Sequence, residues 1–90
     1  MIIQGEHIIE ALRDTGWVLK GRSITKSFMF DNFKQALAFI NEVGDEAEAM
    51  QHHPDIEIHY NRVKFQLSTH DEGGVTEKDI DLAIKINDLM

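Results

Sequence analysis

Residues 24–30 read ITKSFMF, and residues 31–51 read DNFKQALAFINEVGDEAEAMQ. Ile24, Lys26, Phe28 and Phe30 share one face of the first segment, and three of the four are large apolar residues, which predicts a β-strand with one buried face. In the second segment apolar residues recur at spacings of three and four, which predicts an amphipathic helix about 30 Å long. The members of this apolar stripe are Phe33, Ala36, Leu37, Ile40, Val43, Ala47 and Met50. Asp31 or Asn32 can cap the helix, and Pro54 ends the helical stretch.

Alternation returns after Pro54 and predicts a second pair of strands. Residues 56–60 and 63–69 alternate apolar and polar side chains, with Asn61-Arg62 as the hairpin turn. The later segment TEKD, at residues 76–79, has the form of a capping box: a hydroxyl at the N-cap and an acid at the third helical position. The sequence therefore predicts a last helix that begins after Thr76.

Two elements precede residue 24. Residues 5–14 carry a short helical pattern that ends at Thr15-Gly16, and residues 17–20 predict a strand paired with residues 24–30. The order is thus helix, strand, strand, helix, strand, strand, helix. It predicts an α+β fold in which a four-stranded antiparallel sheet is covered on one face by three helices. We expect one domain over residues 1–90, because a chain of this length has room for one core.

The composition excludes several classes of protein. Nine Lys and Arg stand against sixteen Asp and Glu, a formal charge of −7. This balance argues against direct nucleic-acid binding, which depends on basic residues. The chain has no cysteine, which excludes disulfides, thiolate metal sites and thiol nucleophiles. We see no signal-peptide pattern and no apolar run of ~20 residues, so we expect a cytoplasmic protein without membrane contact.

Two of the five histidines are adjacent, in the sequence EAMQHHP at residues 48–54. Glu48 and His52 are four residues apart, so within a helix they would lie on one face and could touch. A carboxylate on one ring nitrogen would fix the tautomer of the histidine and suit it to proton transfer. His53 precedes Pro54, so we expect it to be extended and to point elsewhere. Exposed histidines at a helix end are the alternative interpretation.

A third histidine follows the last predicted strand, in the sequence STHDEGG at residues 68–74. Functional side chains often lie on loops at strand ends, so Thr69 and His70 are candidate site residues. An exposed turn histidine is again the alternative. Asp79 is most simply the acid of the capping box, with any role in the site secondary. Trp17 could line a pocket, although a large aromatic side chain on a strand is more often part of the core.

Other chemistries fit these residues less well. Three histidines with Asp71 or Glu72 could bind zinc, but adjacent histidines diverge, whereas metal ligands on a helix are usually four residues apart. Ser68 lacks the surroundings of a serine-hydrolase motif. The glycine pair lacks the lysine of a phosphate-binding loop. Proton transfer by histidines, without a metal or cofactor, is the chemistry that remains.

Taken together, the two histidine segments resemble the pterin-4a-carbinolamine dehydratase family. The resemblance rests on E-x-x-x-H-H-P at Glu48–Pro54, on Y-x-x-V-x-x-x-L-x-T-H at Tyr60–His70, and on G-V-T-x-x-D at Gly74–Asp79. Gly16-Trp17 and the strand at residues 24–30 agree as well, so the resemblance covers nearly the whole chain. Three residues differ from those common in the family: Lys26, Gln51 and Val75. None of the three is implicated in the chemistry.

The resemblance implies the fold predicted above and the dehydration of 4a-hydroxytetrahydropterin to quinonoid dihydropterin, without metal or cofactor, in tetrahydrobiopterin recycling. It implies that His52, His53 and His70 line the pterin site. For the chemistry itself, we expect His52 and His70 to act as the acid–base pair. The supporting residues we expect are Glu48, Pro54, Thr69, Asp79 and Trp17. Because the family forms dimers or tetramers, we expect a homodimer or a homotetramer.

The resemblance also leaves a second function open. Some animal members of the family act as dimerisation cofactors of a homeodomain transcription factor. The alternative to an enzyme is therefore a protein-binding regulatory module with a vestigial or secondary pterin site.

Overall fold

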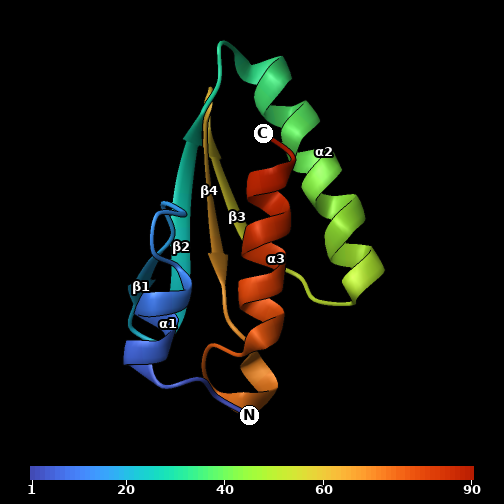
Figure 1. The fold of residues 1–90 in the computed structure, drawn as a ribbon. Helices are drawn as coiled ribbons and strands as arrows, with labels where there is room; N and C mark the ends of the chain where they lie inside the picture. Colours follow the sequence, from blue (N-terminus) through green and yellow to red (C-terminus); the bar gives the residue numbers. More distant parts are fainter.

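The computed structural model describes all 90 residues, and its order of elements is the predicted one (Figure 1). The helices and strands are α1 (Gly5–Ala11), β1 (Val18–Lys20), β2 (Ser23–Met29), α2 (Phe33–Met50), β3 (Asp55–His59), β4 (Arg62–Leu67) and α3 (Glu77–Asp88). A short 3₁₀ turn, His70–Glu72, lies between β4 and α3. None of the helices is both long and apolar enough to cross a membrane.

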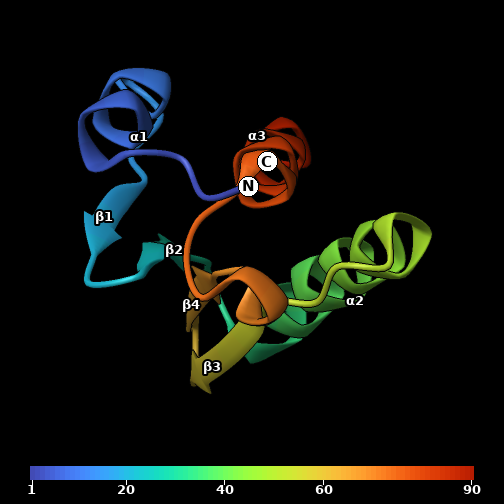
Figure 2. The same cartoon turned by 90° about the horizontal axis from the view of Figure 1, so that it is seen from below.

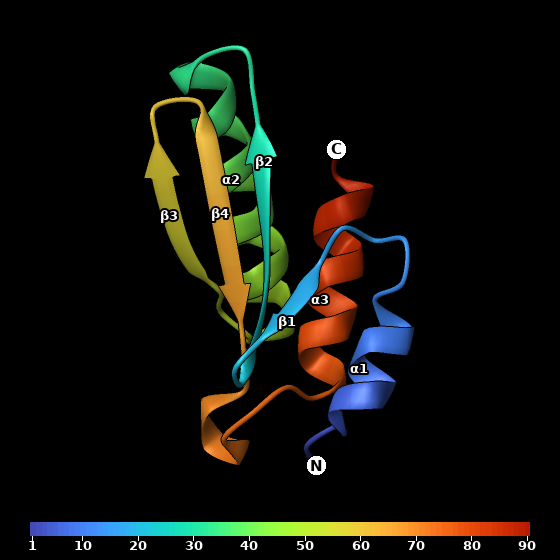
Figure 3. The ribbon, with the colours of Figure 1, turned by 90° about the vertical axis from the view of Figure 1, so that its left-hand side faces the viewer.

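The strands form one antiparallel sheet in the order β1-β2-β4-β3. Figures 2 and 3 show that all three helices lie on the same face of this sheet, while the other face carries no helix. The structure thus confirms the predicted α+β fold, a four-stranded antiparallel sheet covered on one face by three helices. In this arrangement β1 and β3 are the edge strands, and β4 is central.

Alternation along the strands decides which side chains enter the core. Along β4, Val63, Phe65 and Leu67 are fully buried against the helices, whereas the residues between them face the open side of the sheet. Phe65 and Phe28 of β2 pack against Phe39 of α2, with ring centroids 5.9 and 5.2 Å apart. The core is therefore one cluster between the sheet and the helices.

The apolar stripe of α2 differs from the predicted one at three positions. Phe39 is buried, whereas Phe33 and Leu37, predicted members of the stripe, are 45% and 40% exposed. The helix is continuous through Gly44 and begins with Asn32 as its N-cap, whose side chain accepts a hydrogen bond from the Gln35 amide. Spacing alone gave the right helix, but the direction in which it meets the sheet selected the buried face.

Several predicted boundaries were wrong by one to three residues. Helix α1 ends at Ala11, because the chain turns over the next residues and Asp14 takes a left-handed conformation (φ 63°). The hairpin turn is Tyr60-Asn61, since His59 pairs with Arg62, and Arg62 is already the first residue of β4. This register places Arg62 on the open face of the sheet.

Candidate active site

A polar hollow of about 220 Å³ lies where the end of α2, the end of β4 and the start of α3 come together. Figure 2 looks onto this end of the molecule. Its lining contains no apolar residue and consists of Gln51, His52, His53, Ser68, Thr69, His70, Asp71 and Lys78. The structure thus brings the three predicted histidines together, although they come from two segments far apart in the sequence.

The end of α2 explains why two adjacent histidines have different surroundings. Gln51, the C-cap, adopts a left-handed conformation (φ 54°), and the His52 amide then donates to the carbonyl of Ala47 at 3.0 Å. This cap turns the chain sharply, so that His52 is directed into the protein and is 9% exposed. His53 is the next residue and remains at the surface.

His52 is held by Asp79 of α3, and we call these two side chains the inner pair. Nε2 of His52 lies 2.5 Å from Oδ1 of Asp79, and the carboxyl group of Asp79 is completely buried. Oδ2 of Asp79 accepts from the hydroxyl of Thr69 at 2.9 Å and from the amide of Thr76 at 2.8 Å. A carboxylate with this many donors is an acceptor only, so His52 is the donor through its Nε2–H.

Asp79 therefore serves two purposes with its two oxygens. Oδ2 completes the predicted capping box with Thr76, which the structure confirms, and Oδ1 fixes the tautomer of His52. The hydroxyls of Thr69 and Thr76 are 2.7 Å apart, which joins β4 to the same network. Because every partner of the buried carboxylate comes from a different segment, the ring of His52 is held in one orientation.

A second carboxylate–histidine contact lies at the surface, and we call it the outer pair. It joins Nε2 of His53 to Oε2 of Glu48. The expected contact of Glu48 with His52 was wrong, because α2 ends at Met50 and helical spacing no longer applies at residue 52. The two side chains of the outer pair are 58% and 72% exposed, so water surrounds this pair.

His70 begins the 3₁₀ turn directly after Thr69. The turn is closed by the amide of Gly73, which donates to Thr69 O at 2.9 Å, and Gly73 takes the left-handed conformation (φ 77°) that glycine adopts without strain. The amide of Thr69 donates to Gly74 O at 2.8 Å. The backbone of His70 is thereby fixed while its side chain is exposed beside the hollow.

Of the five expected supporting residues only Thr69 lines the hollow, and Asp79 lies behind His52. Trp17 is a core residue, 3% exposed, whose Nε1–H donates to Asn87 Oδ1 at 3.0 Å. Pro54 lies just beyond the histidines and leads the chain into β3. Glu48 acts at the rim through His53 rather than in the hollow itself.

Sequence reasoning missed Lys78 and Gln51 as members of the site. Lys78 contributes the only basic side chain of Lys or Arg type in the lining and forms no ion pair. The capping box placed Lys78 in the first turn of α3, but its closeness to the histidines depends on how α3 meets α2. The described residues contain no group of three His, Asp or Glu side chains arranged to bind a metal ion.

The geometry defines which atom of His52 can exchange a proton. Its Nε2–H donates to Asp79, and Nδ1 has no hydrogen-bond partner within the protein. No side-chain nitrogen or oxygen is both buried and unpartnered, so Nδ1 is accessible from the hollow that His52 lines. An imidazole with one nitrogen fixed by a carboxylate and the other open is arranged for acid–base chemistry.

The chain is similar to known proteins of one family. A family model described as pterin 4 alpha carbinolamine dehydratase matches residues 2–89. A protein of Sulfurisphaera tokodaii with the provisional name pterin-4-alpha-carbinolamine dehydratase is 52% identical over 75 residues, which are 83% of this chain and 81% of that protein. A protein of Thermomicrobium roseum with the same provisional name is 49% identical over 74 residues, 82% of this chain and 80% of its own.

Solved structures show the same fold. The crystal structure of a protein from Brucella melitensis, described as a transcriptional coactivator/pterin dehydratase, has a TM-score of 0.91 and 41% sequence identity, and the match covers 99% of this chain and 98% of that one. A pterin dehydratase-like protein described as a RuBisCO assembly factor of the alpha-carboxysome has a TM-score of 0.67 at 22% identity, over 81% and 84% of the two chains. The second likeness concerns the fold alone.

Proposed function

This chain belongs to the pterin 4 alpha carbinolamine dehydratase family, and from that premise we propose that it dehydrates 4a-hydroxytetrahydropterin to quinonoid dihydropterin. The observation that carries the proposal is the inner pair, whose buried carboxylate holds one imidazole open to a hollow lined by two more. The proposed place of the reaction is the recycling of tetrahydrobiopterin or a related pterin.

The reaction needs one proton removed and one supplied. The bond from N5 to its proton breaks, the lone pair left on N5 forms the C4a=N5 double bond, and the C4a–O bond breaks. The departing hydroxyl takes a proton and leaves as water, so no electrons are gained or lost overall. Two imidazoles near neutral pH can perform both transfers, each typically worth about 10²–10⁴-fold in rate.

We assign the two transfers to His52 and His70, one on each side of the C4a–N5 unit. His52 exchanges its proton at Nδ1, since its Nε2–H remains hydrogen-bonded to Asp79. When Nδ1 is protonated, the buried negative charge of Asp79 stabilises the imidazolium. His70 approaches from the 3₁₀ turn and, being exposed, can exchange its proton with water between turnovers.

The remaining expected residues orient the substrate or position the catalytic histidines. His53 hydrogen-bonds and orients the substrate, and Glu48 fixes the ring of His53 in turn. Thr69 and Asp79 are positioning residues for His52. Pro54 keeps the backbone of His53 extended.

The decisive experiment is a dehydration assay with 4a-hydroxytetrahydropterin generated in place by chemical or enzymatic means. The proposal predicts a rate well above the spontaneous one, undiminished by a chelator such as EDTA. Absence of acceleration would contradict it, and activity lost with EDTA and restored by zinc would indicate a metal-dependent reaction instead.

We also propose a homodimer or homotetramer in the cytoplasm. The edge strands β1 and β3 leave backbone groups unpaired, and α2 exposes Phe33 and Leu37. Light scattering after size-exclusion chromatography would measure the mass, and a monomer at all concentrations would contradict this proposal.

A second candidate function is that of a protein-binding regulatory module. The observation that favours it is the description of the Brucella melitensis protein as a transcriptional coactivator as well as a pterin dehydratase. A variant His52→Ala separates the two functions, because a regulatory role would persist in it while dehydration would be lost.

A further inference from the structure

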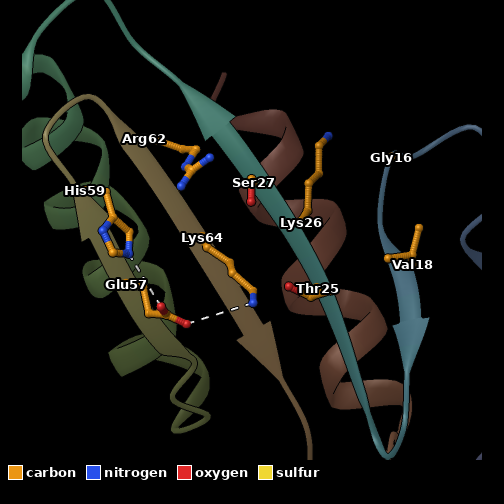
Figure 4. A pocket seen from close by; sticks show the side chains of 9 residues that line it. All are labelled: Gly16, Val18, Thr25, Lys26, Ser27, Glu57, His59, Arg62 and Lys64. Atoms are coloured by element: carbon orange, nitrogen blue, oxygen red, sulfur yellow. Dashed lines mark ion pairs between the residues drawn. The ribbon is translucent and has the colours of Figure 1, made fainter.

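The open face of the sheet, opposite the helices, carries a second hollow of about 440 Å³ (Figure 4). It is lined almost entirely by polar residues, and the ones that matter here are Lys26, Ser27, Glu57, His59, Arg62 and Lys64. We call it the open-face hollow. It shares no lining residue with the histidine hollow, and neither the family resemblance nor the proposed dehydration uses it.

Strand register brings its side chains together. Ser27 of β2, Lys64 of β4 and Glu57 of β3 lie in one row across the sheet, and Arg62 pairs with His59 in a neighbouring row. Arg62 and Lys64 are two residues apart on the central strand, so they share a face at a spacing of about 7 Å. Figure 4 shows both side chains standing on this face together with Glu57 and His59.

The charges of the open-face hollow are not balanced. Glu57 is the one carboxylate, and it lies 3.9 Å from Lys64 Nζ and 3.6 Å from His59 Nε2. Arg62 has no carboxylate partner and no hydrogen bond from its guanidinium. Arg62 and Lys64 against Glu57 leave one positive charge on the open face, with His59 neutral, although the chain as a whole carries −7.

Lys26 is a further cation at the margin of the hollow, but its ammonium is directed to the helix side of the sheet. Its Nζ donates to two neutral oxygens, Thr15 O at 2.8 Å and Asn87 Oδ1 at 2.9 Å, and lies 4.7 Å from the ring centre of Phe28. Burial lowers the pKa of Lys26 from its ordinary value of 10.5, because no carboxylate compensates the lost hydration.

We propose that the open-face hollow binds a small molecule that carries a phosphate group. Its volume lies in the range of small-ligand sites rather than of flat protein contacts. The planar guanidinium of Arg62 matches two phosphate oxygens, Lys64 supplies a second charge, and the exposed hydroxyl of Ser27 can donate to a third oxygen. Arg62, which has no carboxylate partner, together with Lys64 on the same strand suits a multiply charged phosphate better than a single carboxylate.

The test is a titration of the ¹⁵N-labelled protein with inorganic pyrophosphate at constant ionic strength, followed by NMR. The expected result is saturable shifts of the Ser27 and Lys64 amides and of the Arg62 Nε–H. Arg62→Gln is expected to weaken binding by about tenfold or more, since a charge-assisted bidentate contact is lost. Glu57→Gln is expected to strengthen binding, because it removes the negative charge and frees Lys64.

Lys20→Gln is the matched control, since Lys20 is an exposed cation on β1 that does not line the hollow. Equal weakening in Lys20→Gln and Arg62→Gln would reduce the effect to general charge screening and overturn the proposal. Equal affinity for malonate would overturn the preference for phosphate, and tighter binding of a polyglutamate peptide would assign the face to an acidic protein. The absence of shifts at millimolar pyrophosphate would exclude the site.

Because Arg62 lies outside the histidine site, Arg62→Gln is expected to retain full dehydration activity. Loss of pyrophosphate binding and loss of dehydration are therefore separate outcomes, so failure of either proposal leaves the other testable.

Discussion

The inner and outer pairs each join a carboxylate to one of two adjacent histidines, but the two pairs lie in opposite environments. In the inner pair the side chains of His52 and Asp79 are 10% and 0% exposed, whereas in the outer pair those of His53 and Glu48 are 58% and 72% exposed. An exposed ion pair typically contributes ~0–1 kcal/mol, but removing one partner of a buried pair leaves the other without compensation. The environment, more than the contact, decides what each pair does.

This difference matches the division of work we propose. The inner pair needs a fixed tautomer, and three donors hold the carboxylate of Asp79. The outer pair needs access to the substrate, and its exposure provides that. A site built in this way has a rigid half and an adaptable half, and substitutions should distinguish them.

The largest effect is expected from Asp79→Ala. It leaves His52, Thr69 and the Thr76 amide without their acceptor, so the free energy of unfolding should fall by about 3–5 kcal/mol and activity should be lost. Urea denaturation measures the first and the dehydration assay the second. Asp81→Ala, an exposed carboxylate of the same helix, is the control and should stay within about 0.5 kcal/mol of the native protein. If Asp79→Ala does not fold, Asp79→Asn keeps an acceptor oxygen. It should lose less stability and activity than Asp79→Ala, but still more than Asp81→Ala.

The next effect separates His52 from His70. His52→Ala and His70→Ala should each lower kcat/KM by at least about tenfold, because each removes one proton transfer. Only His52→Ala should also lower the free energy of unfolding, by about 1–3 kcal/mol, since the buried Asp79 loses a partner. Normal turnover in both variants would refute the assignment of the acid–base pair.

A smaller effect is expected when the capping box alone is weakened. Thr76→Ala should lower the free energy of unfolding by about 1 kcal/mol, as the loss of an N-cap usually does. Because the hydroxyl of Thr76 is also hydrogen-bonded to that of Thr69, kcat of the variant should fall as well. Asn32→Ala removes the N-cap of α2, far from the histidines, and should reduce stability equally at unchanged kcat. Equal kcat in the two variants would show that the cap does not position His52.

The smallest effect is expected at the outer pair. Glu48→Gln should change the free energy of unfolding by less than about 1 kcal/mol, because both partners are exposed. Its kcat/KM should fall less than that of His52→Ala, mainly through KM. Glu42→Gln, another exposed carboxylate of α2, is the control. A stability loss comparable to that of Asp79→Ala would contradict the comparison of the two pairs.

The parts that could be predicted were those governed by local rules. Strand alternation, the spacing in α2 and the capping box at Thr76–Asp79 depend on residues close in sequence, and each predicted its element. Glu48 was assigned to the wrong histidine because a helical rule was applied one residue beyond the C-cap. A left-handed residue at Gln51 cannot be read from spacing, since Gln is not a residue that favours this conformation.

The sequence by itself determined the order of elements and the one-sided sheet, because these follow from periodicity and from residue types. Two short motifs also indicated the three histidines as candidates. Only the tertiary structure decided that Asp79, 27 residues away, binds His52, that Lys78 lies at the histidine hollow, and that Arg62 and Lys64 form a charged hollow on the opposite face. Such contacts depend on how helices meet and on strand register. Both are set by the packing of the whole core rather than by any short segment.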